Sequence, residues 1–219
     1  MIKTENLFVR FPDGSGIRYC DMRFETGRSY ALLGASGVGK STFLNLISGL
    51  LTPAEGTVTV DDAPITALSR KARDLFRIRR VGYVFQDFKL LEDMTVQDNI
   101  NVLRLEGVDT SGMDPLLDRL GILRLKKRRV KRLSGGEKQR VAIARALIKK
   151  PAIILADEPT GSLNYETGVG VVETLIQNMG EGTLIAVTHD DRLAPRFDAA
   201  LDRNAVAQWV PGGEANQHA

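Results

Sequence analysis

The feature that most constrains the fold is a glycine-rich octapeptide, GASGVGKS, at Gly34 to Ser41. It follows an apolar run, residues 30–33, and precedes residues 42–47, whose apolar spacing predicts a helix packed on a sheet. A strand that leads through glycines into a helix is expected to bind phosphate, because residues without a Cβ expose backbone amides and the helix N-terminus adds positive potential. The expected phosphate contacts come from Gly34, Ala35, Ser36, Gly37, Val38, Gly39, Lys40, Ser41 and Thr42.

Two side chains of this loop have expected chemical roles. The charge of Lys40 is expected to reach the β- and γ-phosphates of a nucleotide, and the Ser41 hydroxyl is expected to ligate Mg²⁺. A glycine-rich turn with an accidental lysine is the alternative. The complete G-x-x-x-x-G-K-S pattern, placed between a strand and a helix, disfavours that alternative.

A second apolar run ends in two carboxylates. Residues 152–156 are typical of a buried parallel strand, which would place Asp157 and Glu158 at its carboxyl end, where α/β proteins bind ligands. Asp157 is expected to hold Mg²⁺ through its water shell, and Glu158 is expected to orient or deprotonate the water that attacks the γ-phosphate. Because residues 159–161 are also turn-forming, an ordinary turn is the alternative, and only the partnership with Lys40 favours a site.

Three further motifs accompany these two. They are LSGGEKQR at Leu133 to Arg140, Gln86 after an apolar strand, and His189 after the β-type run 183–188. In this order, the motifs resemble those of ATP-binding cassette (ABC) transporter ATPases, and the resemblance covers nearly all 219 residues. It implies an α/β fold, a P-loop NTPase (RecA-like) core with an N-terminal antiparallel β subdomain and an inserted α-helical subdomain. It also implies an ATPase that uses ATP and Mg²⁺.

The resemblance assigns roles to the added motifs. Ser134, Gly135 and Gly136 would contact the γ-phosphate of ATP bound to a second copy of the chain, which suits their place at the start of a predicted helix. Because they have no lysine of their own, a head-to-tail dimer with two ATP molecules at its interface is expected. Gln86 would link the metal site to a membrane partner, and His189 would be the switch histidine. The expected catalytic residues are Glu158, His189, Gln86 and Lys40, and the expected metal-site residues are Ser41, Gln86 and Asp157.

An aromatic residue near the start of the chain is expected to stack on adenine. Phe11 occupies the place that matches the family, and Phe8 is the second candidate. Stacking requires only a π-face, so Phe would serve in place of the more usual Tyr, although a core or edge-strand role is the competing interpretation.

Asn164 departs from the family pattern, which usually ends the stretch after the second carboxylate in Asp. The amide keeps a hydrogen-bonding side chain and loses the charge. By the resemblance, this position communicates with the opposite glycine loop. We therefore expect Asn164 to contact the nucleotide site and to affect coupling between two sites more than ATP binding.

Length and composition predict a single compact unit, and the resemblance implies that this unit, residues 1–219, is one ABC nucleotide-binding domain. Within it, residues 1–86 and 150–219 are expected to form the ATP-binding core lobe, and residues 87–149 the helical lobe that contains the signature motif. Residues 94–105 and 114–125 are expected to be helical. The smaller lobe is expected to swing when ATP binds.

The sequence contains no apolar run of the length that spans a bilayer and no signal sequence at its start. We therefore expect a peripheral protein at the cytoplasmic face of the cell membrane. The single cysteine, Cys20, cannot form an internal disulfide.

Basic residues crowd one segment, although the formal net charge is only +3. Neither this segment, residues 124–132, nor a second basic segment, residues 70–80, has the regular aromatic interleaving that stacks on bases. A solvated surface is the favoured interpretation and membrane proximity is the second. No specific nucleic-acid partner is expected.

Residues 84–100 and 155–163 are similar to one ABC subgroup. It comprises lipoprotein-release, macrolide-export, haem-export and antimicrobial-peptide-resistance ATPases and the cell-division ATPase. The resemblance implies an integral membrane partner, which we expect to dock near Gln86 to Met94, and ATP-driven export or extraction of a hydrophobic or amphipathic cargo. A signalling ATPase without cargo and, less favoured, a soluble ABC assembly ATPase are the alternatives.

Overall fold

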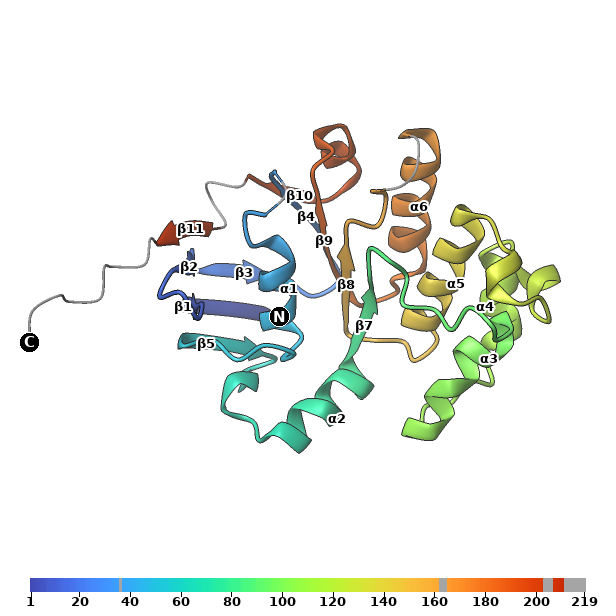
Figure 1. Ribbon diagram of the computed structural model, residues 1–219, viewed down its shortest axis with the longest axis horizontal. Helices are drawn as coiled ribbons and strands as arrows, with labels where there is room; N and C mark the ends of the chain where they lie inside the picture. The colour runs from blue at the N-terminus through green and yellow to red at the C-terminus, as the bar shows by residue number, and fades with distance from the viewer. Residues whose placement is uncertain (36, 162–164, 203–206, 211–219) are drawn as a thin grey trace, which may run out of the picture.

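The computed structural model describes residues 1–35, 37–161, 165–202 and 207–210. It contains two sheets and a group of helices at one end (Figure 1). The central sheet has five strands in the order β10-β4-β9-β8-β7, and all of its pairs are parallel. Its strands are β4 (Ser29–Leu33), β7 (Val81–Val84), β8 (Ile153–Asp157), β9 (Thr183–Thr188) and β10 (Ala199–Leu201).

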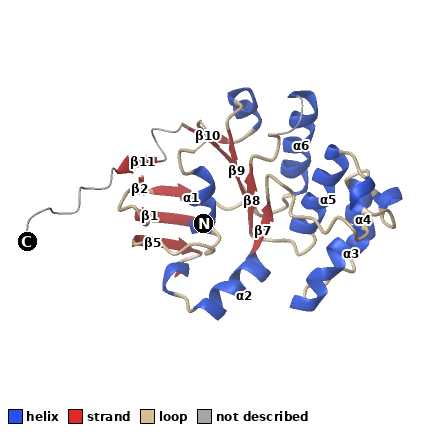
Figure 2. Cartoon of the chain, in the orientation of Figure 1, coloured by secondary structure: helices blue, strands red, loops and turns tan. Residues whose placement is uncertain are grey.

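The second sheet is antiparallel and has the order β11-β2-β1-β5-β6, with β3 paired to β1. It confirms the N-terminal antiparallel subdomain. Strand β11 comes from a part of the chain far from the other strands of this sheet, and Figure 2 shows it beside β2. The strands are β1 (Ile2–Arg10), β2 (Gly16–Tyr19), β3 (Met22–Phe24), β5 (Glu55–Val60), β6 (Ala63–Pro64) and β11 (Ala207–Val210).

Alternating side chains of the parallel strands enter two cores. In β8, Ile153 and Leu155 pack with the antiparallel sheet and with helix α1, whereas Ile154 and Ala156 pack with the helices on the other face. This alternation explains why the strand is a continuous apolar run, since both of its faces are covered. The predicted buried parallel strand at residues 152–156 is thus confirmed.

Helix α1 (Lys40–Ile47) begins directly after the glycine loop and lies between the two sheets. Its apolar residues Phe43, Leu44, Leu46 and Ile47 are fully buried. Packing on both sides fixes the start of the helix, and so fixes the loop that leads into it. The remaining α-helices are α2 (Arg70–Arg80), α3 (Val96–Asn101), α4 (Met113–Arg119), α5 (Gly135–Leu147) and α6 (Tyr165–Asn178).

Residues 94–125 are less regular than predicted. The first expected helix is α3 followed by a 3₁₀ segment, Val102–Glu106. The second is α4, which ends near Gly121, and only a short 3₁₀ segment, Leu123–Leu125, follows. Gly121 has φ 68°, a left-handed conformation that commonly terminates helices and that glycine adopts without strain. The lobe boundaries at residues 86/87 and 149/150 remain a prediction.

The chain has a free cysteine, Cys20. Within the described ranges, no helix has both the length and the apolar character needed to cross a membrane.

Candidate functional site

A cavity of about 560 Å³ lies at the carboxyl ends of the central strands. It brings together residues that are far apart in the sequence, including the glycine loop, the second carboxylate and the candidate histidine. Its lining residues are Phe11, Ile17, Ala35, Gly37, Gly39, Lys40, Ser41, Thr42, Gln86, Glu158, Gly161, His189 and Trp209.

Gly39 is the position in the loop where a side chain cannot be accommodated. Its φ is 95°, and an added Cβ would lie 2.7 Å from Ile17 Cδ1 and 2.9 Å from the Tyr19 hydroxyl. That hydroxyl donates a 2.8 Å hydrogen bond to the Gly39 carbonyl, and burial raises its pKa. Tyr19, which the sequence did not single out, therefore supports the end of the glycine loop from strand β2.

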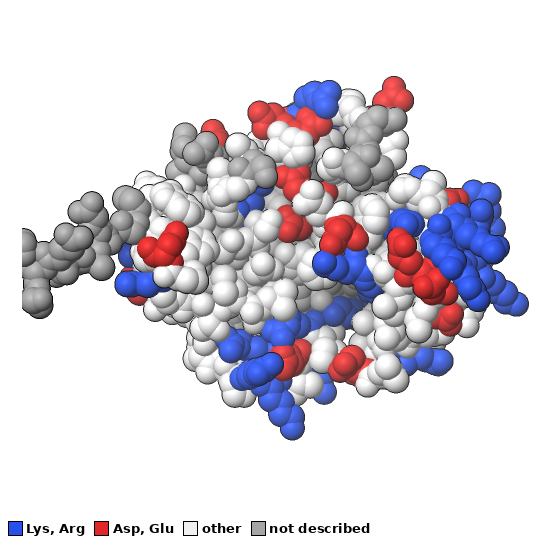
Figure 3. Space-filling view, viewed as in Figure 1, with Lys and Arg blue, Asp and Glu red and all other residues white. Residues whose placement is uncertain are grey.

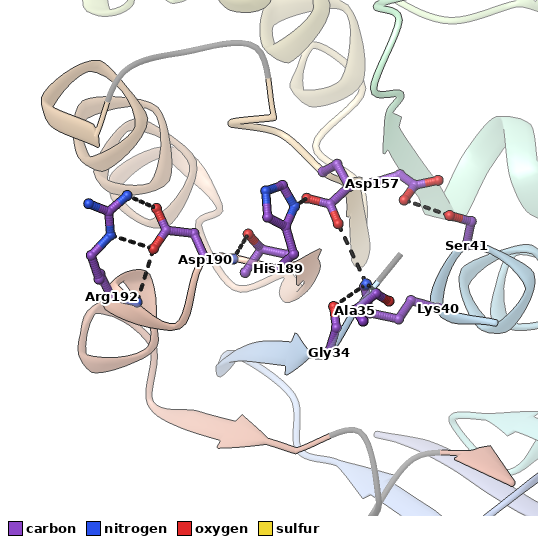
Figure 4. Close-up of polar contacts among 10 residues, drawn as sticks. Gly34, Ala35, Lys40, Ser41, Asp157, His189, Asp190 and Arg192 are labelled. Carbon is purple, nitrogen blue, oxygen red and sulfur yellow. Dashed lines mark hydrogen bonds and ion pairs between the residues drawn. The ribbon is translucent and has the colours of Figure 1, made fainter. Parts of the chain in front are cut away.

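Lys40 is held inside the loop that precedes it. Its Nζ donates hydrogen bonds of 2.6 Å to the Gly34 carbonyl and 2.9 Å to the Ala35 carbonyl (Figure 4). The Lys40 side chain is 6% exposed, and Nζ lies 3.5 Å from Glu158 Oε1. The ammonium group is thus positioned at the cavity, where a phosphate could replace the carbonyl oxygens as its partner.

The expected metal-site residues Ser41 and Asp157 are in contact. Ser41 Oγ donates a 2.9 Å hydrogen bond to Asp157 Oδ1. Burial raises the pKa of the Asp157 carboxyl, the negative charge of Glu158 adds to this, and the Ser41 hydrogen bond opposes it. Gln86 and Asp157 also line one shared cavity.

These oxygen donors fit Mg²⁺, which binds through one or two protein groups and otherwise through phosphate and water. A hydroxyl and a carboxylate side by side are such a set. In the parts of the chain that the structure describes, no group of three or more His, Cys, Asp or Glu could hold a metal ion. Phosphate oxygens of a nucleotide and water would complete the shell of Mg²⁺ at such a pair.

Glu158 and His189 form the other polar pair of the cavity. Glu158 Oε2 lies 2.8 Å from His189 Nδ1, and the Glu158 amide donates a 3.0 Å hydrogen bond to the Val187 carbonyl. Glu158 has φ 44°, a conformation that costs energy for a residue with a Cβ and that is most often found at functional sites. Its side chain is 12% exposed. The strained backbone turns this carboxylate toward the glycine loop and the histidine.

Asp190 supports the turn that carries His189, a role that sequence analysis did not predict. Its carboxylate accepts hydrogen bonds from the Arg192 amide, at 3.1 Å, and from the Arg192 guanidinium, at 2.8 Å, as Figure 4 shows. The Asp190 amide in turn donates to Thr188 Oγ1 at 3.1 Å. The hydrogen bonds from Arg192 lower the pKa of the Asp190 carboxyl. These hydrogen bonds therefore stabilise the turn after β9.

The signature residues start helix α5, as predicted. Ser134 is its N-cap: Ser134 Oγ accepts a hydrogen bond from the Glu137 amide, and Glu137 Oε2 accepts one from the Ser134 amide at 2.9 Å. An added Cβ would meet no atom within 4 Å at Gly135, and only Thr167 Cγ2, at 4.0 Å, at Gly136. None of Ser134, Gly135 and Gly136 lines the cavity described above.

Phe11, which directly follows β1, lines the cavity, whereas Phe8 is only 6% exposed and lies under the Arg18 guanidinium. Of the two aromatic candidates, Phe11 is thus the one placed at the cavity. Its ring stacks on Trp209, with ring centroids 5.7 Å apart and an interplanar angle of 22°.

Four other expected contact residues need separate mention. Val38 is half-buried and does not line the cavity, whereas Thr42 does. Ser36 and Asn164 lie outside the described residues. Their expected roles remain predictions.

The chain matches the family model for the ABC transporter over residues 17–161. The chain belongs to this family. Its core is accordingly the P-loop NTPase core with an antiparallel sheet and inserted helices, and its activity is ATP hydrolysis. The fold class, the resemblance and the ATPase activity predicted from the sequence are confirmed, and binding of ATP follows from the family.

Individual relatives agree with this assignment. A lipoprotein-releasing system ATP-binding protein, LolD, of Pseudomonas syringae is 38% identical, over 82% of this chain and 82% of LolD. A methionine import ATP-binding protein, MetN 1, of Pseudomonas fluorescens is 43% identical, over 100% of this chain and 69% of MetN 1. A solved dimeric structure of the ATP-binding cassette MJ0796, bound to ADP and phosphate after hydrolysis, is 31% identical. It matches with a TM-score of 0.80 over 92% of this chain and 94% of that one.

Proposed function

We propose that this chain is the ATP-hydrolysing subunit of a membrane complex, and that two copies close head to tail around two ATP molecules to drive export or extraction of a hydrophobic or amphipathic cargo. The observation that carries the proposal is the placement of Glu158. Its carboxylate lies between His189, at 2.8 Å, and Lys40, at 3.5 Å, in the cavity that the glycine loop opens onto.

The chemistry assigned to these residues is phosphoryl transfer to water. The loop amides and Lys40 bind the β- and γ-phosphates, which places the γ-phosphate at Glu158. Glu158 accepts a proton from the attacking water or orients that water, and His189 holds the Glu158 carboxylate in position. Ser41, Gln86 and, through its water shell, Asp157 would hold Mg²⁺, which would supply positive charge at the phosphate oxygens. Each of these residue roles is part of the proposal.

The position of the signature residues supports the head-to-tail dimer. The signature residues Ser134 to Gly136 form an exposed helix N-terminus, with amides able to bind an anion, yet they do not line the cavity of their own chain. A second copy would bring these residues to the γ-phosphate. The MJ0796 cassette, which matches over most of its length, is dimeric.

A second cavity supports a membrane partner. It measures about 430 Å³ and lies beside the predicted docking segment, 86–94, of which Lys89 is a lining residue. Phe85 and Leu103 contribute apolar surface, and the cations Arg77, Lys89, Arg145 and Lys149 outnumber the single acid, Glu106. A cytoplasmic helix of the partner with apolar residues and a carboxylate would fit this groove.

Two of these cations are poorly solvated. Arg145 donates hydrogen bonds to the backbone carbonyls of Phe88, at 2.7 Å, and Lys89, at 2.6 Å. Lys149 donates to the Arg77 carbonyl at 2.9 Å. Burial lowers the pKa of both side chains, that of Lys149 to about 8. A partner carboxylate in the groove would offset this desolvation, which favours an acidic residue in the docked helix.

The cargo is proposed from the similarity to LolD, a protein of a lipoprotein-releasing system. The match to a methionine import protein, MetN 1, is of comparable identity. A peripheral location at the cytoplasmic face of the membrane follows from the proposed partner.

The experiment that tests the proposal is purification of the Glu158→Gln form with ATP from detergent-solubilised native membranes, followed by mass spectrometry. A multi-spanning partner with an extracytoplasmic domain supports it, and the recovered complex can then be assayed for release of a lipid-modified or amphipathic substrate. Recovery of soluble partners alone contradicts the membrane part of the proposal. A Lys89→Glu variant is expected to lose the partner, whereas Lys127→Glu, a matched change in the basic run outside the groove, is expected to keep it.

A further inference from the structure

Trp209 lies at the candidate nucleotide cavity, although it is separated from Phe11 by most of the chain. It belongs to β11, which pairs antiparallel with β2 so that Trp209 stands opposite Ile17. Directly opposed residues of an antiparallel pair share one face of the sheet. The Ile17 side chain on that face approaches the glycine loop, since its Cδ1 would lie 2.7 Å from a Cβ at Gly39. Strand pairing therefore places Trp209 on the side of the sheet that faces the loop.

The Trp209 side chain is open to solvent even though it is the largest apolar side chain of the cavity. It is 60% exposed, in contrast to Ile17, its strand neighbour, at 3%. Its one described ring partner is Phe11, at 5.7 Å between centroids and 22° between planes. A tryptophan with a purely structural role would be more deeply buried, because burial of its ring is the source of its stabilising effect. Here much of the indole surface is free to meet a ligand.

The lining of the cavity is of two chemical kinds. Lys40, Ser41 and Glu158 provide charges and a hydroxyl, and Phe11 and Trp209 provide aromatic surface. A nucleotide has the same division, with phosphates at one end and a planar base at the other. Bases stack readily on aromatic side chains, because every base presents a π-face.

We propose that Trp209 is a second base-binding residue, which together with Phe11 forms an aromatic platform for the adenine of the nucleotide. The inference rests on the proposed nucleotide site. The base does not fit between the two rings as they stand, since two van der Waals contacts in series need about 7 Å. It stacks instead across the free surface of the pair, and Trp209 widens the surface beyond what the single Phe11 ring offers.

The chain itself supplies the probe, because Trp209 is its only tryptophan. Titration with ADP is compared with titration with inorganic diphosphate, which has no base. Selective excitation of tryptophan should report a saturable change in emission with ADP and none with diphosphate. Equilibrium dialysis with labelled ADP measures binding independently of the fluorescence.

Variants separate base contact from a structural role. Trp209→Ala is expected to weaken ADP binding about tenfold, which corresponds to the usual free-energy contribution of one aromatic side chain stacked on a base. Its affinity for inorganic diphosphate should not change. If the variant instead disturbed the folding of the glycine loop, its affinity for diphosphate would fall as well. Trp209→Phe is expected to recover most of the ADP affinity. Gln208→Ala, an exposed neighbour in β11, is the matched control and is expected to bind ADP as the unchanged protein does.

Three outcomes overturn the inference, and one of them also overturns the proposed function. If the unchanged protein binds ADP in dialysis without a change in Trp209 emission, and Trp209→Ala binds ADP equally well, the base does not contact Trp209 and the nucleotide site stands. If the unchanged protein binds neither ADP nor ATP, the inference and the proposed function both fail. Equal weakening of ADP and diphosphate binding in Trp209→Ala also overturns the inference, since the tryptophan would then act on the loop.

Discussion

Glu158 and His189 meet across the carboxyl ends of two neighbouring parallel strands, with 2.8 Å between Glu158 Oε2 and His189 Nδ1. The two residues are 31 positions apart, and the register of β8 with β9 brings them together. The positive φ of Glu158 aims its carboxylate at both His189 and Lys40. If Glu158 is the general base that we propose, this placement on two sides leaves it little freedom to lose when it acts, which is the usual benefit of a preorganised site.

Replacement of this carboxylate tests its assigned role. Glu158→Gln keeps the size and hydrogen-bonding capacity of the side chain and removes the base, so ATP binding should persist while turnover falls about 10²-fold or more. The closed dimer should accumulate with ATP. Phosphate release measures turnover, and light scattering after size exclusion measures the dimer. Undiminished hydrolysis would remove Glu158 from the mechanism.

Ser134 combines a structural role with a proposed functional role, and the two can be separated. As N-cap of α5, it is expected to contribute about 1 kcal/mol to the free energy of unfolding, so Ser134→Ala should lower that value by this amount. If Ser134 also contacts ATP of the second copy, the variant should dimerise poorly with ATP. Urea unfolding and ATP-dependent size exclusion are the two measurements.

Ser69→Ala is the matched control for Ser134→Ala. Ser69 caps α2 in the same way, accepting a hydrogen bond from the Ala72 amide, and it belongs to a different helix from the signature motif. A similar loss of stability with normal ATP-dependent dimerisation is the expected result. Equal dimerisation of both variants would contradict the role of Ser134 at the interface.

Tyr19→Phe should weaken nucleotide binding through the glycine loop. The change keeps the ring, which packs against Phe43, and removes the hydrogen bond to the Gly39 carbonyl. Loss of about 1 kcal/mol corresponds to an affinity about fivefold lower for ATP and for inorganic triphosphate alike, since both use the loop. Tyr30→Phe removes another buried phenol contact, the one to the Glu25 amide, and should not alter ATP affinity. An unchanged ATP affinity in Tyr19→Phe would show that the loop does not need this bond.

The sequence predicted the local parts of the site and not the contacts between distant segments. Lys40, Ser41, Asp157 and Glu158 could be identified because each follows an apolar strand at a fixed spacing. Tyr19 contacts the loop only through the fold of the antiparallel sheet, and Trp209 reaches Phe11 only because β11 joins that sheet. Strand partners across such distances leave no periodic signal in one sequence.

The helical part shows a different limit of sequence analysis. The apolar pattern of residues 94–125 identified helical structure but not its interruptions. The C-terminal end of α4 depends on turn chemistry at Gly121, which the apolar period does not contain. The apolar residues of this region are nevertheless buried as the pattern implies, among them Val96, Ile100, Leu116 and Leu117.

Lys149 predicts a specific pH dependence of stability. Burial lowers its pKa in the folded protein to about 8, below the 10.5 of an unperturbed lysine. Between these two pH values, the unfolded chain therefore binds more protons than the folded one. The contribution of Lys149 to the free energy of unfolding rises with pH across that window and is lost as pH falls through about 8. Lys149→Met removes the contribution, so the free energy of unfolding of the unchanged protein minus that of the variant should increase from pH 7.5 to pH 10 by on the order of 1–2 kcal/mol.

Urea unfolding at several pH values measures this difference. Lys150→Met changes the adjacent exposed lysine and is the control that should show no such trend. If the difference in free energy of unfolding between the unchanged protein and Lys149→Met does not vary with pH, the ammonium group is fully solvated. The argument for an acidic partner residue in the groove would then lose its basis.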